Sequence, residues 1–278
     1  MLVRGAGSYK ISNKDVVSFT FDDPEYDRDR PVLIDPSEPS RYYTYNTARK
    51  TVRQLIAGLH AAGLKRDDTV CIHSFNSLLY PLLVLAIIGA GGLSVGTNPS
   101  YTHHELNHAV KVAKITMVFA EPEILPNMLS ALNENNIDVG SKLFVLDTQP
   151  GQKVPDRMKS WRTLLNRGEQ EWLRFDDERS SRDTVAQLYY TSGTTGLPKC
   201  AMTTHRCLVS EHQLFFEANP RTYPIKLVLC MPFFHVGILP QVLVSALKEG
   251  REAYVMRRFE LEPYMQYHAK YQLTETFM

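Results

Sequence analysis

The chain has 278 residues, of which 44% are hydrophobic and 22% are charged, and its net charge is +1. These values lie near globular averages and exclude a disordered, collagen-like or disulfide-scaffold protein. The near-neutral balance gives no basic surface for nucleic acid, but it leaves room for a local site that binds a small polyanion.

Strand and helix patterns alternate along the first half of the chain. After an extended opening at residues 16–21 and 31–35, Thr44 is expected to cap a helix that ends at Gly63. The pattern then predicts strands at residues 69–73, 93–96, 115–119 and 143–146, and helices at residues 77–90, from 103 and near 122–132. This alternation is typical of a largely parallel sheet covered by helices.

Residues 78–96 contain no charged side chain, and 19 such residues approach the length that spans a bilayer. Pro81 and three glycines interrupt the stretch, and no cationic flank follows it. A buried helix followed by a buried strand therefore fits this stretch better than a membrane span.

The chain divides into two sheet-forming parts. We predict a first α/β subdomain with an extended N-terminal arm at residues 1–148, a polar connection at 149–184, and a second subdomain at 185–278 that is incomplete at its C-terminus. The second part has strand patterns at residues 185–190, 226–231 and 252–256, and helix patterns at 205–218, 236–248 and 261–270. Residues 272–278 begin another apolar strand without a turn, which predicts a fragment, an unusually spliced product or part of an assembly.

The segment from Tyr189 to Lys199 reads YYTSGTTGLPK and suits a polyphosphate. Glycines let backbone amides crowd around an anion, threonine and serine hydroxyls add donors, and Lys199 supplies a positive charge. Its glycine and lysine spacing does not fit a Walker loop, and a strand pattern at residues 201–204 follows instead of a helix. A Ser/Thr/Gly hairpin turn is the alternative.

Residues 190–199 resemble the signature loop of the adenylate-forming superfamily, which includes acyl- and aryl-CoA ligases, luciferases and peptide-synthetase adenylation domains. Residues 43–45, 89–102 and 232–237 resemble further blocks of that family in the same order, in a form closest to 4-coumarate-CoA-ligase-like proteins. The match runs from about residue 16 to 278 and covers about half of a usual family chain. It implies the N-terminal part of the ligase fold, with two mostly parallel sheets covered by helices and the second sheet incomplete.

The resemblance assigns roles to individual residues. ATP phosphates would be held by Thr191, Ser192, Gly193, Thr194, Thr195, Gly196 and Lys199. A carboxylate would attack the α-phosphorus to give acyl-AMP, with Mg2+ accompanying ATP and no protein metal site predicted, and the acyl group would then pass to CoA. His235 and Lys199 are the candidate catalytic residues, and Arg258, beside Arg257, would lie near CoA. The alternatives are that His235 caps the following helix and that at least one arginine is a solvated strand end.

Two departures from the family pattern matter. Cys200 stands where the family usually has glycine after the loop lysine. The family's adenine- and Mg-binding Thr-Glu segment, its ribose-binding aspartate and its C-terminal domain with a catalytic lysine all follow the matched region. Two hypotheses result: an ATP-dependent acid–thiol ligase represented by its N-terminal part, or a truncated non-catalytic relative that binds nucleotide, acid or a partner chain at the sheet edge near residues 272–278.

Residues 104–108 read HELNH and match the HExxH pattern of zinc proteases. Thr102 and Glu105 also form a capping box, so the start of a surface helix explains the glutamate without a metal. We favour the helix start.

The four cysteines form no CxxC pair, which predicts a reducing compartment. The N-terminal residues lack the apolar run of a secretory signal. A cytoplasmic location is expected, or a peroxisomal one if a longer C-terminus exists.

Overall fold

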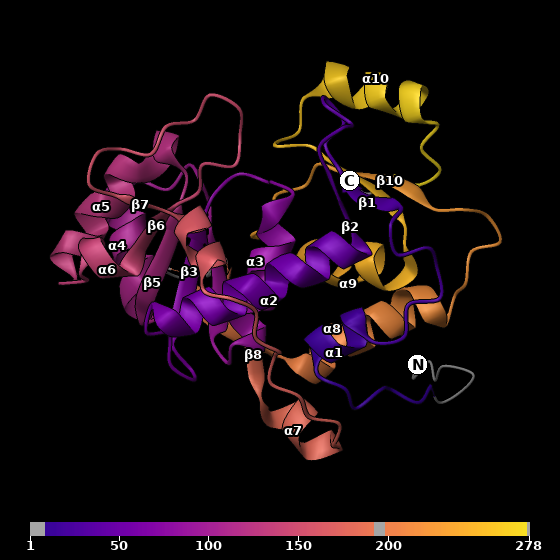
Figure 1. Cartoon of the computed structure of the whole chain (residues 1–278), viewed down its shortest axis with the longest axis horizontal. Helices are drawn as coiled ribbons and strands as arrows, with labels where there is room; N and C mark the ends of the chain where they lie inside the picture. The colour runs from indigo at the N-terminus through magenta and orange to yellow at the C-terminus, as the bar shows by residue number, and fades with distance from the viewer. Residues whose placement is uncertain (1–8, 192–197, 277–278) are drawn as a thin grey trace, which may run out of the picture.

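The computed structural model describes residues 9–191 and 198–276. In this part of the chain the strands form two mostly parallel sheets, ordered β7-β6-β5-β3-β4-β8-β9 and β10-β11-β1-β2 (Figure 1). Only the pairs β8–β9 and β1–β2 are antiparallel among those described. The strands are β1 Pro31–Ile34, β2 Tyr42–Thr44, β3 Thr69–His73, β4 Leu93–Thr97, β5 Ile115–Ala120, β6 Leu143–Val145, β7 Lys159–Ser160, β8 Val185–Thr191, β9 Lys199–Thr204, β10 Lys226–Leu229 and β11 Glu252–Val255.

Helices cover both sheets, which confirms the predicted α/β class. Figure 1 shows α4, α5 and α6 gathered beside β5–β7, whereas α10 lies on the side of β10 and β1. The helices are α1 Val16–Phe21, α2 Tyr45–Ala61, α3 Leu79–Gly89, α4 His103–Val112, α5 Leu125–Glu134, α6 Val139–Lys142, α7 Glu178–Asp183, α8 His205–His212, α9 Leu239–Glu249 and α10 Leu261–Tyr271. A π-helical turn, Gln213–Glu217, extends α8.

Helix α3 lies at the centre of the molecule, and all of its residues are buried. It contacts α2 and α9, and its side chains join one apolar cluster that reaches strands of both sheets. The apolar stretch at residues 78–96 is therefore a buried helix followed by a buried strand, as predicted. Within the described residues, every helix is too short or too polar to cross a bilayer.

Local capping explains where α2 begins and ends. The Thr44 side chain accepts a hydrogen bond from the Thr47 amide, and the Thr47 hydroxyl accepts one from the Thr44 amide in return. Gly63 has a φ of +78°, a left-handed conformation that glycine adopts without strain. Both predicted ends of this helix are confirmed.

The prediction of an extended segment at residues 16–21 is wrong, because these residues form α1. Asp15 caps the helix by accepting a hydrogen bond from the Ser18 amide at 2.8 Å. All six residues of α1 are buried, and the helix packs on α9 and α8. Packing on every side of the segment outweighs the weak preference of its β-branched residues for strand.

The polar connection at residues 149–184 contains ordered structure. It includes β7, a 3₁₀ turn at Trp161–Asn166 and α7, and its side chains Trp161 and Trp172 are buried. The strands of each sheet come from both sides of this segment, since β1 and β2 join β10 and β11 while β8 and β9 extend the larger sheet. The subdomain boundaries proposed from the sequence stay a prediction.

A buried histidine joins α1 to α8. The Val16 amide donates to His205 Nδ1 at 3.2 Å, so the ring is neutral, and burial lowers the pKa of His205 to about 4. In the unfolded chain the His205 imidazole binds a proton near pH 6.5, whereas in the folded chain it stays neutral at that pH. A lower pH therefore favours the unfolded chain. We expect this residue to remove about 2 kcal/mol of unfolding free energy between pH 7.5 and pH 5.

Urea unfolding of wild type and His205→Asn at both pH values measures this loss. The Oδ1 atom of asparagine stands where Nδ1 stood and can accept the same hydrogen bond but does not titrate, so the variant should lose about 2 kcal/mol less than wild type over this range. Equal losses in the two proteins would contradict the prediction.

Candidate functional site

The two ends of the predicted phosphate loop are held together by a β-hairpin. Thr191 ends β8, Lys199 begins β9, and these two residues are paired across the hairpin. Both side chains are exposed. Ser192, Gly193, Thr194, Thr195 and Gly196 lie outside the described residues, so their contacts with phosphate stay predictions. Cys200 continues β9 opposite Tyr190 as a regular strand residue.

The hairpin leaves the sheet beside the end of a neighbouring strand. β8 runs parallel to β4, so Thr191 at the end of β8 and residues 98–100 after β4 lie at the same edge. Ligands of α/β proteins commonly bind outside the carboxyl ends of parallel strands. Thr191 and Lys199, which flank the predicted phosphate loop, therefore lie at the edge where such a fold binds a ligand.

Helix α4 contacts the chain on both sides of the predicted phosphate loop. His108 Nε2–H donates to the carbonyl oxygen of Pro198 at 2.8 Å, and the Tyr190 hydroxyl donates to the carbonyl oxygen of Ala109 at 2.9 Å. Glu105 is engaged with Thr102 in the predicted capping box. The HELNH segment thus has a structural explanation, and no cluster of three potential metal ligands occurs within residues 9–191 and 198–276.

The segment with His235 lies against β4. A Cβ atom built on Gly96 would come within 2.7 Å of Phe234 Cβ, so the glycine allows the segment to approach the strand closely. Phe233 is buried and packs edge-on to Tyr80, whereas His235 is exposed. Partial burial still lowers the pKa of His235, which favours the neutral imidazole.

The alternative role of His235, as the cap of the following helix, does not match the structure. Helix α9 begins at Leu239, and its N-cap residue is Ile238, without a side-chain capping bond. The imidazole is therefore not used to start the helix.

His235 and Arg258 line one cavity of about 280 Å³. Its polar wall includes Asn98 and Ser100, which follow β4, and its apolar wall includes Phe234 and Phe259. The structure thus brings together two of the predicted site residues, although Lys199 does not line this cavity among the described residues. A cavity with an aromatic wall, a neutral histidine and an arginine can hold a small organic acid.

The two adjacent arginines differ in their surroundings. Arg257 makes an ion pair with Glu121 at 2.6 Å and lies over the Phe75 ring. The Arg258 side chain is 67% exposed and pairs with Glu260 at 2.8 Å. Both arginines line the cavity, but Arg257 is held by Glu121, whereas Arg258 is mostly exposed to solvent.

Sequence reasoning missed Glu121, whose partners Ser74, Phe75 and Arg257 line this cavity. Its carboxylate is fully buried and accepts hydrogen bonds from the Ser74 hydroxyl at 2.7 Å and the Phe75 amide at 3.0 Å, in addition to the Arg257 pair. Burial raises the pKa of Glu121 despite these partners. A charged residue directly after the apolar strand β5 was the available signal.

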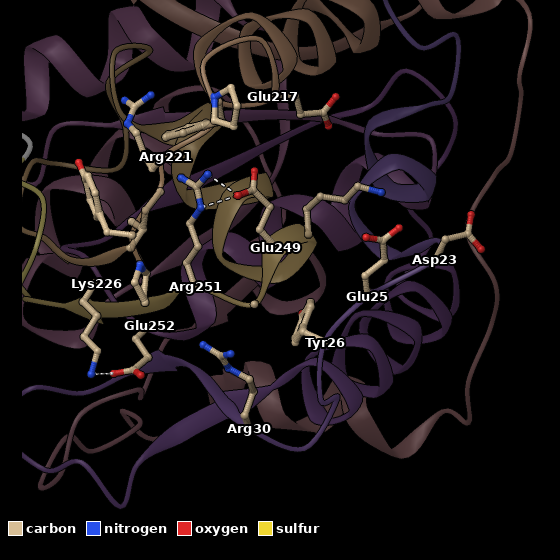
Figure 2. A pocket seen from close by; sticks show the side chains of 17 residues that line it. Asp23, Glu25, Tyr26, Arg30, Glu217, Arg221, Lys226, Glu249, Arg251 and Glu252 are labelled. Atoms are coloured by element: carbon tan, nitrogen blue, oxygen red, sulfur yellow. Dashed lines mark hydrogen bonds and ion pairs between the residues drawn. The ribbon is translucent and has the colours of Figure 1, made fainter.

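A larger cavity, of about 640 Å³, lies at the opposite ends of β10 and β11 from the loops that carry His235 and Arg258. Figure 2 shows two ion pairs among its charged side chains, Lys226 with Glu252 at 3.1 Å and Arg251 with Glu249. None of the predicted site residues lines it among those described. Its size therefore does not make it the candidate site.

Comparison with known proteins shows the family of this chain. The family model described as AMP-binding enzyme matches residues 21–278. A phenylacetyl-CoA ligase and an acyl-CoA ligase, both from Aspergillus niger, are 41% identical to this chain over 276 residues, which is 99% of this chain and 51% and 52% of those proteins. The chain spans about half the length of the curated relatives it matches.

The chain also resembles a solved structure, again over about half of that protein's length. A long-chain-fatty-acid-CoA ligase from Archaeoglobus fulgidus superposes with a TM-score of 0.83 at 22% identity, over 99% of this chain and 53% of that one. The predicted fold class is therefore confirmed.

Proposed function

Because this chain belongs to the AMP-binding enzyme family, we propose that it takes part in the ATP-dependent ligation of a carboxylic acid to CoA. The observation that carries the proposal is the placement of two features at one edge of the sheet. These are the hairpin that brackets the predicted phosphate loop and the segment with His235, which lies on the neighbouring strand β4. A truncated relative without activity is not favoured, because the similarity to named ligases covers 99% of this chain.

The chemistry would proceed in two transfers. A carboxylate oxygen of the acid attacks the α-phosphorus of ATP, pyrophosphate leaves, and an acyl-adenylate forms. The thiol sulfur of CoA then attacks the acyl carbon, its proton is released, and AMP leaves. Lys199, with Mg2+ brought by ATP, would neutralise phosphate charge, and His235 would lie beside the acid and the path of the thiol.

The acid class is proposed from the cavity. Phe234 and Phe259 provide an aromatic wall, and one of the relatives at 41% identity is named a phenylacetyl-CoA ligase. We therefore propose an aryl or arylalkyl acid. Arg258 would contact CoA or the acid from the open side of the cavity.

The cytoplasmic location stays a proposal.

Thermal unfolding with Mg-ATP tests the nucleotide part of this proposal. ATP at about 100 times its dissociation constant should stabilise the folded chain by about 2.7 kcal/mol, and a panel of aryl acids should add to this. Lys199→Ala should remove most of the ATP response, since one charge-assisted contact contributes about 1.5–3 kcal/mol. Lys111→Ala, an exposed lysine of α4, is the matched control. A wild-type chain that melts cooperatively with no ATP response would overturn the proposal.

A further inference from the structure

Asn76 joins three separate segments through one side chain. It follows β3, is 3% exposed, and donates from Nδ2 to the carbonyl oxygens of Met231 at 2.9 Å and Met256 at 3.1 Å. Its Oδ1 accepts from the Phe233 amide at 2.9 Å. The backbone amide of Asn76 also donates to the carbonyl oxygen of Arg257 at 3.1 Å.

These partners belong to the loops that line the 280 Å³ cavity. Met231 and Phe233 stand in the loop after β10, which carries His235, and Met256 and Arg257 begin the loop after β11, which carries Arg258. All of the partners are backbone groups, so their identity does not depend on the neighbouring side chains. A carboxamide supplies two donors and an acceptor in one plane, which matches this set.

We propose that Asn76 is a positioning residue that fixes the loop of His235 relative to the loop of Arg258. Its role in ligand binding rests on the proposed function, but its role in placing His235 does not. Without the Phe233 anchor, the loop would keep its packing on Tyr80 and the turn bond from the His235 amide to the Pro232 carbonyl oxygen. The loop would therefore stay folded, but the position of His235 relative to the cavity would no longer be fixed.

The isosteric variant Asn76→Asp separates positioning from simple packing. At pH 7.5 its carboxylate would face the carbonyl oxygens of Met231 and Met256, and both donors would be lost. At pH 5.5 a larger fraction of the buried carboxyl group would be protonated, which restores one O–H donor. The defect should therefore be smaller in acid, whereas a defect caused only by lost packing would not change in this direction.

The first readout is the rate at which diethyl pyrocarbonate modifies His235, mapped by mass spectrometry and compared with wild type at the same pH. We expect a change of at least about threefold in Asn76→Asp at pH 7.5, with an unchanged rate at His104, which is exposed on α4. The second readout is aryl-acid affinity, which should weaken about tenfold. An unchanged His235 rate in the folded variant would overturn the inference.

Two further results keep the inference testable. If wild type binds neither ATP nor acid while the His235 rate changes in the variant, the proposed function fails and the positioning role stands. If Asn76→Asp does not fold, hydrogen exchange of wild type decides the matter. The Phe233 amide should then exchange at least about tenfold more slowly than the Phe234 amide, and equal rates would overturn the inference.

Discussion

Replacing Glu121 with alanine is expected to lower the free energy of unfolding by about 2–4 kcal/mol. The carboxylate is fully buried, and its loss would remove the acceptor of the Ser74 hydroxyl and the Phe75 amide. Arg257 would lose its partner at 2.6 Å and keep Glu123 at 3.7 Å. Since the Arg257 side chain is 33% exposed, water offsets part of the loss of its partner, and the unpaired buried donors account for much of the cost.

Two matched variants separate the causes of this loss. Glu121→Gln keeps an acceptor for Ser74 and Phe75 but removes the charge that faces Arg257, so it should cost less than alanine. Glu123→Ala removes a half-exposed carboxylate 3.7 Å from the same arginine and should cost less than about 1 kcal/mol. Urea unfolding at pH 7.5 measures all three. A Glu121→Ala protein within about 1 kcal/mol of wild type would mean that the site tolerates an unpaired arginine.

Local sequence patterns predict most helices and strands of this fold. They do not predict which of these elements contact one another. Residues 69–73 and 115–119 were predicted as strands, because apolar β-branched runs bounded by polar residues identify strands locally. That β1 pairs with β11, more than 200 residues away, depends on packing between segments, and no local pattern carries that information. The α1 segment was mispredicted for the same reason, since its helix is stabilised by burial against α8 and α9.

The residues of the candidate site also fall into two groups, those that stand in a local motif and those whose role depends on contacts between distant segments. Lys199 and His235 were predicted as site residues because each stands in a recognisable motif. The sequence assigned Arg258 to CoA, but it did not show how the surroundings of Arg257 and Arg258 differ, because that difference depends on Glu121 at the end of β5. Asn76 was missed because a single asparagine after a strand carries no signal until its partners after β10 and β11 are known.

Gly96→Ala is expected to destabilise the chain by about 3 kcal/mol and to displace the segment that carries His235. The new Cβ would lie 2.4 Å from the Tyr80 hydroxyl oxygen, 2.7 Å from Phe234 Cβ and 2.9 Å from Phe234 Cα. Tyr80 is 2% exposed and packs against Phe233, so its ring cannot swing aside. The backbone of Phe234 must therefore move away from β4, and the next residue, His235, must move with it.

The control comes from the other end of the same loop. Gly237→Ala would place its Cβ where no described atom lies within 4 Å, so stability should change by less than about 1 kcal/mol. Urea unfolding gives the two free energies, and diethyl pyrocarbonate modification shows whether His235 has moved. If Gly96→Ala were as stable as Gly237→Ala and His235 kept its wild-type rate, the close approach of the loop to β4 would not set the position of this histidine. Asn76 alone would then have to account for it.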